Sequence, residues 1–262
     1  MKYRIEKDSL GDVRVPEKAL WGAQTQRALD NFTISGIKFV FPFGRSFIEA
    51  LGMIKFSAAA ANNKLKLLPA NKAAAIKLAS KDVLNGLHDD SFPLDVFQTG
   101  SGTSTNMNAN EVIANIASKK SKLKINANDD VNMSQSSNDV IPTAICVSAL
   151  IDMNRLLLPN LDKLINSIDS KMKQVKGNIK TGRTHLMDAM PIDFSQELSG
   201  WKAQLEANKK TITQATNRMN ELPQGGTAIG TGINAHKDFS KNFCSELNKL
   251  SKFNTKPAKN FY

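Results

Sequence analysis

Apolar side chains recur at alternating steps of four and three residues from Val140 to Val175. The positions of this seam are apolar except for Asn154, and they are Val140, Ala144, Val147, Ile151, Asn154, Leu158, Leu161, Ile165, Ile168, Met172 and Val175. Such spacing over about five heptads predicts a long helix packed lengthwise against other helices. Leu150, Leu157 and Leu164 widen the stripe, which favours a bundle over a lone coiled coil. Pro159 lies inside the pattern and is expected to kink this helix without ending it.

A second seam with the same spacing follows, and its positions are Phe194, Leu198, Trp201, Leu205, Asn208, Ile212, Ala215, Met219 and Leu222. Gly177 is expected to end the first long helix, and Pro191 to lie in the first turn of the second. A connection of about a dozen residues predicts that the two helices run antiparallel. Asn154 and Asn208 are the polar members of the two seams, where a polar residue can set the register.

The rest of the chain shows shorter helical patterns and no convincing strand pattern or tandem repeat. Helices are expected at residues 45–66, 70–87, 109–119 and 237–250. The first of them has one apolar face, formed by Phe47, Ile48, Leu51, Ile54 and Ala58. Residues 1–45 have little periodicity and several turn signals. The sequence therefore predicts an all-α fold.

Composition adds a basic balance to this picture. The chain has 262 residues and a formal net charge of +11, with lysine and arginine spread along its length. A basic surface attracts anions, including small carboxylates, although a solvated lysine-rich surface explains the same charge. Nucleic acid is not an expected partner, because no basic cluster is interleaved with aromatic residues and no recognition motif is present.

Cysteine usage and the chain start bear on the compartment. Cys146 and Cys244 lack metal-ligand spacing and are expected to be free thiols in a reducing compartment. The first residues are charged where a signal peptide would be apolar, and no apolar run approaches membrane-spanning length. We therefore expect a cytoplasmic protein with no membrane partner. No metal is expected either, because the adjacent side chains of His88, Asp89 and Asp90 in a turn seldom converge on one ion.

Four polar segments are candidates for binding. Thr99–Asn108 is rich in glycine and hydroxyl residues and leads into a helix, which is typical of an anion site but also of a well-capped helix start. Asn126–Asp139 is almost wholly polar and is either a surface loop or a binding loop. Gly230, Gly232 and Ala235 match a dinucleotide fingerprint by spacing, but a helix precedes them instead of a strand, so no cofactor is expected.

The fourth segment, Gly182–His185, follows the first long helix. His185 can act as an acid or base, although a lone loop histidine is more often structural. The polar segment Asn126–Asp139, called the serine-rich loop below, and the His185 loop lie at opposite ends of a helix that is roughly 50 Å long. If both contribute to one site, that site must form between subunits of a homo-oligomer.

At these motifs the chain resembles class II fumarases, members of the fumarase/aspartase superfamily. The segments with the resemblance are Glu6–Gly11, Leu20–Arg27, Thr99–Val112, Asn128–Asp139, Gly182–His185 and Gly225–Gly232. It runs over the whole chain and covers a little over half of a family member. The resemblance implies a mainly helical N-terminal lyase domain with the glycine and serine loops at residues 1–138. It makes residues 139–262 the first part of the central long-helix bundle domain.

The resemblance also implies a reaction, the reversible addition of water to fumarate to give L-malate in the citric acid cycle. A base removes a proton next to a carboxylate, and the carbanion, stabilised as an aci-carboxylate, loses hydroxide. The residues implied to bind substrate are Ser101, Gly102, Thr103, Ser136, Ser137 and Asn138. Thr184 and His185 are implied to come from another subunit, with His185 as the acid/base, in a homotetramer.

The chain departs from the family at several points. It stops at Tyr262, before the family's remaining bundle helices, its mobile serine loop and its C-terminal domain, so the 262 residues alone are expected to be inactive. Asn126 stands where fumarases often have a histidine, which weakens the expectation of an accessory dicarboxylate site at Asn126, Asn128 and Asp129. Met133 replaces a lysine that is common in the serine-rich loop.

Two alternatives remain beside fumarate hydratase. Aspartate ammonia-lyase shares the fold and the glycine loop, but aspartases usually have glutamine where this chain has His185. The other alternative is a non-catalytic fragment that needs a complementary chain.

Overall fold

The computed structural model describes residues 2–38 and 44–262. These residues form two compact units, of which unit 1 comprises Met1–Ala149 and Met219–Tyr262, and unit 2 comprises Leu150–Arg218. Helices are the main secondary structure of both units, which confirms the all-α prediction. The domain boundary implied after residue 138 stays a prediction.

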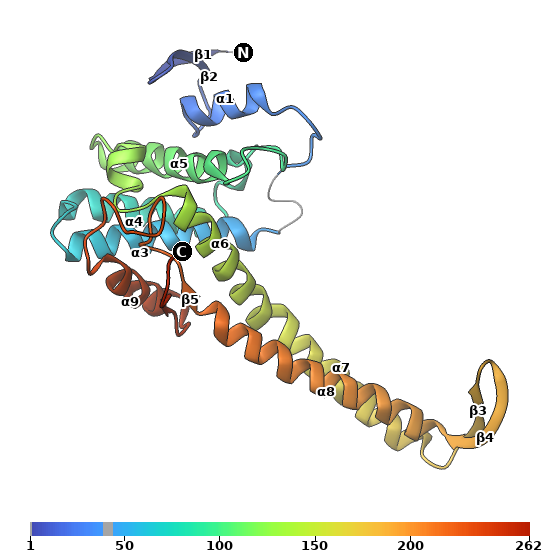
Figure 1. The fold of residues 1–262 in the computed structure, drawn as a ribbon. Helices are drawn as coiled ribbons and strands as arrows, with labels where there is room; N and C mark the ends of the chain where they lie inside the picture. Colours follow the sequence, from blue (N-terminus) through green and yellow to red (C-terminus); the bar gives the residue numbers. More distant parts are fainter. Residues whose placement is uncertain (1, 39–43) are drawn as a thin grey trace. The chain divides into compact units, whose positions relative to one another are not determined.

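Unit 1 is built around helix α3 (Ser46–Lys64), which packs against α4 (Ala70–Leu84) and α9 (Phe239–Ser251) (Figure 1). The predicted apolar face of α3 is buried throughout, and its members are Phe47, Ile48, Leu51, Ile54 and Ala58. Helix α5 (Thr103–Ser121) packs against α4 and against α1 (Ala23–Asn31). A 3-10 turn, η1 (Asp89–Ser91), follows α4.

Helix α5 begins at Thr103, six residues before the predicted start at residue 109. The prediction was wrong because its first turns consist of serine, threonine and asparagine, which are usually loop residues. Here their polar groups are satisfied inside the fold. Thr105, for example, donates from its backbone N and its Oγ1 to Gln98 Oε1, at 3.0 and 2.7 Å.

Short strands occur in three places where none was predicted. In unit 1, β1 (Tyr3–Asp8) and β2 (Gly11–Pro16) form an antiparallel hairpin, and β5 (Glu221–Leu222) pairs in parallel with β6 (Lys256–Pro257). The β1–β2 hairpin buries Val13 and Val15 on one side and leaves most other residues at least partly exposed, so its alternation is weak. Both cysteines are free thiols, as predicted.

The first long helix consists of α6 (Ser137–Asp152), a π-helical turn η3 (Met153–Leu157) and α7 (Leu158–Val175). The predicted irregularity is present, but it precedes Pro159. Pro159 has no N–H to donate to the carbonyl of Arg155, and its ring crowds that carbonyl, so the preceding turn widens. Asn154 does not reach another helix, because its Nδ2 donates to Leu150 O of its own helix at 2.7 Å.

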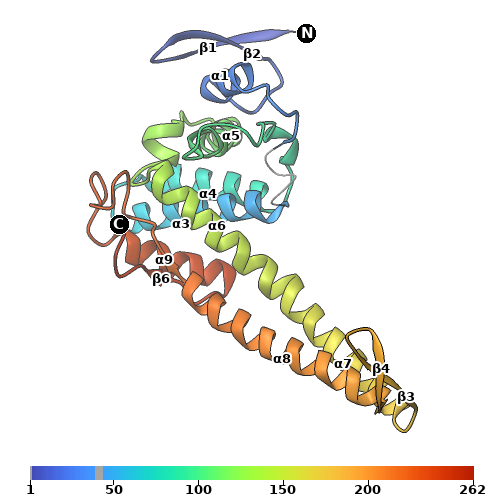
Figure 2. The ribbon, with the colours of Figure 1, turned by 45° about the vertical axis from the view of Figure 1, so that its right-hand side comes forward.

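In unit 2, α7 and α8 (Phe194–Met219) lie side by side and antiparallel, as predicted (Figures 1 and 2). Ion pairs connect them in antiparallel register: Lys202 Nζ lies 2.5 Å from Asp169 Oδ1, and Lys209 pairs with Asp162. Both helices leave apolar side chains exposed, including Leu164 and Trp201, which are 47% and 55% exposed.

The connection between α7 and α8 is a β-hairpin, formed by β3 (Ile179–Thr184) and β4 (Met187–Asp193). Pro191 lies in β4 opposite Thr181, so its predicted place in the first turn of the second helix was wrong, and α8 begins at Phe194. A two-stranded hairpin has only edge strands, and proline costs no interstrand hydrogen bond where its nitrogen faces away from the partner strand. Gly177, with a φ of +89°, follows the end of α7 as predicted.

The helical segment Ser137–Val175 is long and apolar enough to cross a membrane by length and composition. The mean hydropathy of an 18-residue stretch within this segment is 1.5, and 33% of that stretch is buried inside the fold. This corrects the expectation that no segment approaches spanning length. It is weak evidence for a membrane, because a core helix of a soluble protein passes the same test.

Candidate functional site

A cavity of about 430 Å³ lies in unit 1 between the start of α5, the serine-rich loop and the glycine-rich loop after α8. Its lining consists of hydroxyl, amide and a few apolar residues, and these are Thr103, Asn106, Met107, Asn132, Ser134, Gln135, Ser136, Ser137, Asn138, Thr227, Ala228, Ile233 and Asn234. The cavity therefore brings together four residues of the predicted substrate site: Thr103, Ser136, Ser137 and Asn138.

The glycine- and hydroxyl-rich segment at residues 99–108 reaches this cavity because its backbone can turn and pack closely at Gly102. Gly102 has a φ of +70°, and a Cβ added to it would lie 2.8 Å from the side chain of Ile141 in α6. Only glycine fits such a close approach in the left-handed region. Ser101 and Gly102 themselves do not line the cavity, but Ser101 Oγ lies 2.9 Å from Thr103 Oγ1, so the predicted hydroxyls are neighbours.

The Asp139 side chain connects the glycine-rich loop after α8, which contains Gly225 and Thr227, to the serine-rich loop by hydrogen bonds. Its carboxylate is buried and accepts hydrogen bonds from the backbone N of Ser136 (2.9 Å), Gly225 (3.0 Å) and Thr227 (2.9 Å). Burial raises the pKa of Asp139, and the three N–H donors and the charge of Lys55 oppose that rise. Asn138 Nδ2 adds a bond to Ala228 O at 2.8 Å. The two loops are thereby fixed around the cavity.

The lining suits a carboxylate guest and lacks a catalytic base. Hydroxyl and amide groups donate hydrogen bonds to a carboxylate without adding negative charge. None of the lining side chains is a His, Cys, Lys, Tyr, Asp or Glu. In the described parts of the chain, no three His, Cys, Asp or Glu side chains are grouped so as to hold a metal ion. Proton transfer at this cavity therefore needs a group from elsewhere.

Lys55 of α3 lies directly beneath the cavity. Its side chain is 0% exposed, and its Nζ donates to Asn106 Oδ1 (2.8 Å), Asn132 Oδ1 (3.0 Å) and Gln135 Oε1 (2.9 Å). Burial lowers the pKa of Lys55 to about 7, while the negative charge of Asp139 opposes this fall.

Thr184 and His185 belong to unit 2, where they end strand β3 and form its turn. His185 and Leu186 form the two-residue connection of the hairpin, with φ values of +48° and +62°. Both side chains of the turn are exposed, and His185 does not line the cavity beside the hairpin. Thr184 lines a separate cavity of about 680 Å³ between the hairpin and the start of α8. The structure thus does not bring these two residues into the unit 1 cavity.

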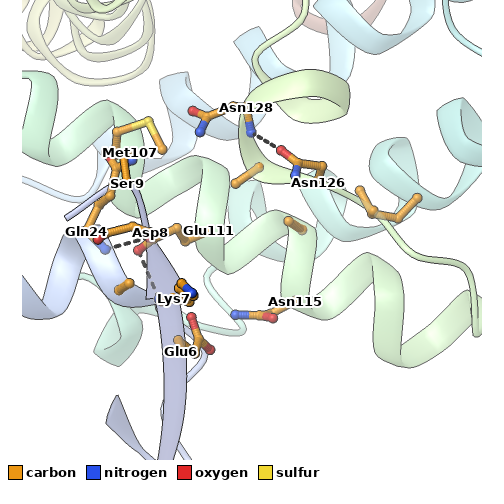
Figure 3. A pocket seen from close by; sticks show the side chains of 15 residues that line it. Glu6, Lys7, Asp8, Ser9, Gln24, Met107, Glu111, Asn115, Asn126 and Asn128 are labelled. Atoms are coloured by element: carbon orange, nitrogen blue, oxygen red, sulfur yellow. Dashed lines mark hydrogen bonds between the residues drawn. The ribbon is translucent and has the colours of Figure 1, made fainter. Parts of the chain in front are cut away.

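The predicted accessory site lies at the π-helical turn η2 (Ala127–Val131). Asn126 Oδ1 accepts from the backbone N of Asn128 at 2.8 Å (Figure 3) and from the backbone N of Asp129 at 3.0 Å. The N–H groups that could receive a carboxylate are therefore already bonded within the chain. Asp130 accepts from Asn126 N and pairs with Lys72, which fixes the turn further.

Asn126 and Asn128 line another cavity of unit 1, of about 340 Å³, together with Lys7 and Gln24 (Figure 3). Glu111 forms part of its wall. The Glu111 carboxylate accepts from the N–H groups of Gly22, Gln24 and Thr25 and from Thr25 Oγ1, and burial raises its pKa. This carboxylate holds the start of α1, and both of its oxygens already accept hydrogen bonds, so few acceptor sites remain for a ligand.

Several residues at the main cavity were not predicted from the sequence: Asn106, Asn132 and Thr227 in its lining, and Lys55 beneath it. For Lys55 a signal was present. It stands four residues after Leu51 and three before Ala58, which is the spacing of the buried face of α3. A lysine on such a face must be paired or hydrogen-bonded, and that would have indicated a polar site beneath it.

Comparison with known proteins adds to this geometry. A sequence model of the lyase family matches residues 11–262. The class II fumarate hydratase of Xylella fastidiosa is 50% identical over 259 residues, covering 99% of this chain and 54% of that protein. The enzyme of the same name from Bacillus subtilis is 47% identical over 266 residues, covering 99% and 57%.

The crystal structure of recombinant class II fumarase from Schistosoma mansoni is similar to the whole chain, with a TM-score of 0.94 at 38% identity. It is covered over 58% of its own length. The chain therefore spans about half the length of the curated relatives it matches.

Proposed function

This chain belongs to the lyase family, and we propose that it is part of a fumarate hydratase, which adds water reversibly to fumarate to give L-malate. The observation that supports this most is the unit 1 cavity, which gathers Thr103, Ser136, Ser137 and Asn138 around a space suited to a small carboxylate. In this proposal unit 1 provides the carboxylate-binding part of the active site.

The proposed chemistry begins with removal of a proton from the carbon next to a carboxylate of malate. Negative charge then grows on that carboxylate in an aci-carboxylate, and hydroxide leaves from the neighbouring carbon. Donors that point at this oxygen pair stabilise the intermediate more than the substrate, which lowers the barrier. The Ser136 and Ser137 hydroxyls, the Thr103 hydroxyl and the Asn138 amide would supply such donors, with Ser101 and Gly102 beside them.

We propose that His185 and Thr184 come to this cavity from a second copy of the chain. The cavity lining has no base of its own, whereas His185 is exposed at a hairpin turn in the other unit. The exposed apolar faces of α7 and α8 favour association with further copies. As the resemblance implies, the complete protein would be a homotetramer of the cytoplasm and would act in the citric acid cycle.

An accessory dicarboxylate site at Asn126, Asn128 and Asp129 is not part of this proposal. The side chain of Asn126 already occupies the N–H groups of the other two residues. A ligand would have to displace this internal hydrogen bonding before it could bind there.

The test is an ultraviolet absorbance assay of fumarate, with malate and aspartate offered side by side. The purified chain would be assayed alone and after co-expression with the C-terminal part of the Xylella fastidiosa relative that it does not cover. We expect fumarate from malate only in the co-expressed sample, and none from aspartate. Fumarate from aspartate would favour an ammonia-lyase. Inactivity of a well-folded, assembled complex with both substrates would refute the proposal.

A further inference from the structure

Lys55 is a buried cation, and among the described residues no acidic side chain contacts its ammonium. All three hydrogen bonds of its ammonium go to neutral side-chain oxygens, those of Asn106, Asn132 and Gln135. Asp139 is the nearby charged group that acts on it, and the Asp139 carboxylate is itself occupied by three backbone N–H groups. A buried charge without an ion pair costs free energy, so its retention calls for a reason beyond packing.

The position of its three acceptors supplies that reason. Asn106, Asn132 and Gln135 all line the 430 Å³ cavity. Because the Asn106 Oδ1 accepts from Lys55, its Nδ2 must point the other way, and it donates to Ser137 Oγ at 3.0 Å and to Asn132 Oδ1 at 3.2 Å. The lysine therefore fixes which end of this amide faces the serine.

The bond from Asn106 determines what Ser137 can do. Ser137 Oγ accepts from Asn106, so its own O–H proton remains available to donate to a guest in the cavity. Hydrogen bonds aligned in this way polarise one another, and a charge at the start of the series strengthens the last donor. The series runs from Lys55 Nζ to Asn106, and from Asn106 to Ser137.

We propose that Lys55 is a positioning residue for the substrate carboxylate, acting through Asn106 to hold Ser137 as a hydrogen-bond donor and leaving its positive charge for the bound anion. The identity of the anion as a dicarboxylate rests on the proposed function. The series of donors itself does not. A purely structural role, in which Lys55 only ties α3 to α5 and to the serine-rich loop, is the alternative that an experiment must separate.

The experiment measures binding of succinate, a dicarboxylate that cannot be hydrated, to the complete 262-residue chain by isothermal titration calorimetry. Lys55→Met removes the charge and the donors, and Lys64→Met is its matched control, since Lys64 is an exposed lysine at the end of the same helix. We expect Lys55→Met to weaken succinate binding by about tenfold to a hundredfold, which is the usual effect of losing a charged hydrogen-bond donor. Lys64→Met should bind as the wild type does.

A second variant separates positioning from stability and keeps the test valid if Lys55→Met folds poorly. Asn106→Leu leaves Lys55 in place and interrupts the series, so it should weaken succinate binding to a similar degree. In the double variant Lys55→Met/Asn106→Leu, the two losses of affinity should not add, because both residues act through Ser137. Replacing both partners with apolar side chains should at the same time recover part of the thermal stability.

The outcomes are distinct. Unchanged succinate affinity in well-folded Lys55→Met, or additive losses in the double variant, would overturn the inference and leave the proposed function standing. Absence of succinate binding by the wild-type chain would also overturn it. If succinate binds in a Lys55-dependent way but no complex hydrates fumarate, the inference stands and the proposed function fails.

Discussion

The two units differ in how far they bury an apolar seam of the same kind. In unit 1, the seam residues Val140, Ala144 and Val147 are completely buried, as is Leu51 of α3. In unit 2, the seam continues through α7, but Ile165 is the buried residue of that helix, and the buried residue of α8 is Thr216. Unit 1 encloses its own core, whereas unit 2 presents an apolar surface to its surroundings.

This difference indicates that a heptad pattern predicts a helix and its apolar face without stating which molecule covers that face. It also separates the proposed chemistry. The hydroxyl and amide donors belong to the enclosed unit, where a rigid surround holds them in place. The candidate acid/base, His185, belongs to unit 2, whose apolar surface is exposed.

The largest expected effect is on turnover. In a full-length enzyme that includes these residues, His185→Asn should lower the rate of malate dehydration by about 10²- to 10⁴-fold, the usual contribution of an acid/base group. Succinate affinity should change little, because the proposed carboxylate donors Thr103, Ser136, Ser137 and Asn138 all belong to unit 1 and stay in place. Ser137→Ala should weaken succinate binding as well as turnover. Steady-state kinetics and calorimetry on both variants would test this contrast, and unchanged turnover in His185→Asn would remove His185 from the mechanism.

A comparable effect is expected on the stability of unit 1 as a function of pH. The pKa of Lys55 is about 7 in the fold and 10.5 when unperturbed, so the unfolded chain binds more protons between these values. The contribution of Lys55 to the free energy of unfolding therefore rises by about 5 kcal/mol from pH 7 to pH 10.5, and below pH 7 it is constant. Urea unfolding should show a steeper rise with pH for Lys64→Met than for Lys55→Met. Equal slopes would contradict the low pKa.

The next effect compares equal truncations in the two units. Leu51→Ala should destabilise unit 1 by about 2–5 kcal/mol, because Leu51 is completely buried. Leu164→Ala should cost less than about 1 kcal/mol in dilute, unassociated protein, because Leu164 is 47% exposed. Thermal unfolding at several protein concentrations would measure both. The cost at Leu164 should grow with concentration if this face is covered by another copy, and a cost independent of concentration would count against that role.

The smallest effect concerns the hairpin turn of unit 2. Leu186 has a φ of +62°, a conformation that asparagine tolerates better than leucine. Leu186→Asn should therefore stabilise the hairpin, by less than about 1 kcal/mol. Amide hydrogen exchange in β3 and β4 would detect it. Faster exchange in the variant would show that the leucine is held by contacts that this chain alone does not reveal.

The long helices of the fold could be predicted because their seams are long and regular, and the buried face of α3 was found for the same reason. The β3–β4 hairpin could not be predicted. Most of its residues are exposed on both sides, so it lacks the alternation by which a half-buried strand is recognised. The early start of α5 was missed because its polar residues are satisfied by groups outside the helix. Thr105 bonds to Gln98, Asn108 donates to Ser91 O, and Asn106 bonds to Lys55 and Ser137.

The loops that form the candidate site could be predicted from the sequence, but the hydrogen bonds that connect their side chains could not. Thr103, Ser136, Ser137 and Asn138 do meet at one cavity. The amides behind them depend on a lysine 51 residues before Asn106 in the chain, a pairing that no local pattern encodes. The consequence of Asn126 was likewise invisible in the sequence, because only the conformation of the π-turn shows its side chain bonded to Asn128 and Asp129.

Subunit mixing tests whether unit 1 of one copy and the hairpin of another form a single active site, as we propose. Two inactive full-length proteins, His185→Asn and Ser137→Ala, would be unfolded together, refolded together and assayed for malate dehydration. We predict that the mixture regains activity that neither protein has alone, because some sites then combine an intact Ser137 with an intact His185 from different copies. A mixture that forms hybrid oligomers and yet stays inactive would contradict the claim.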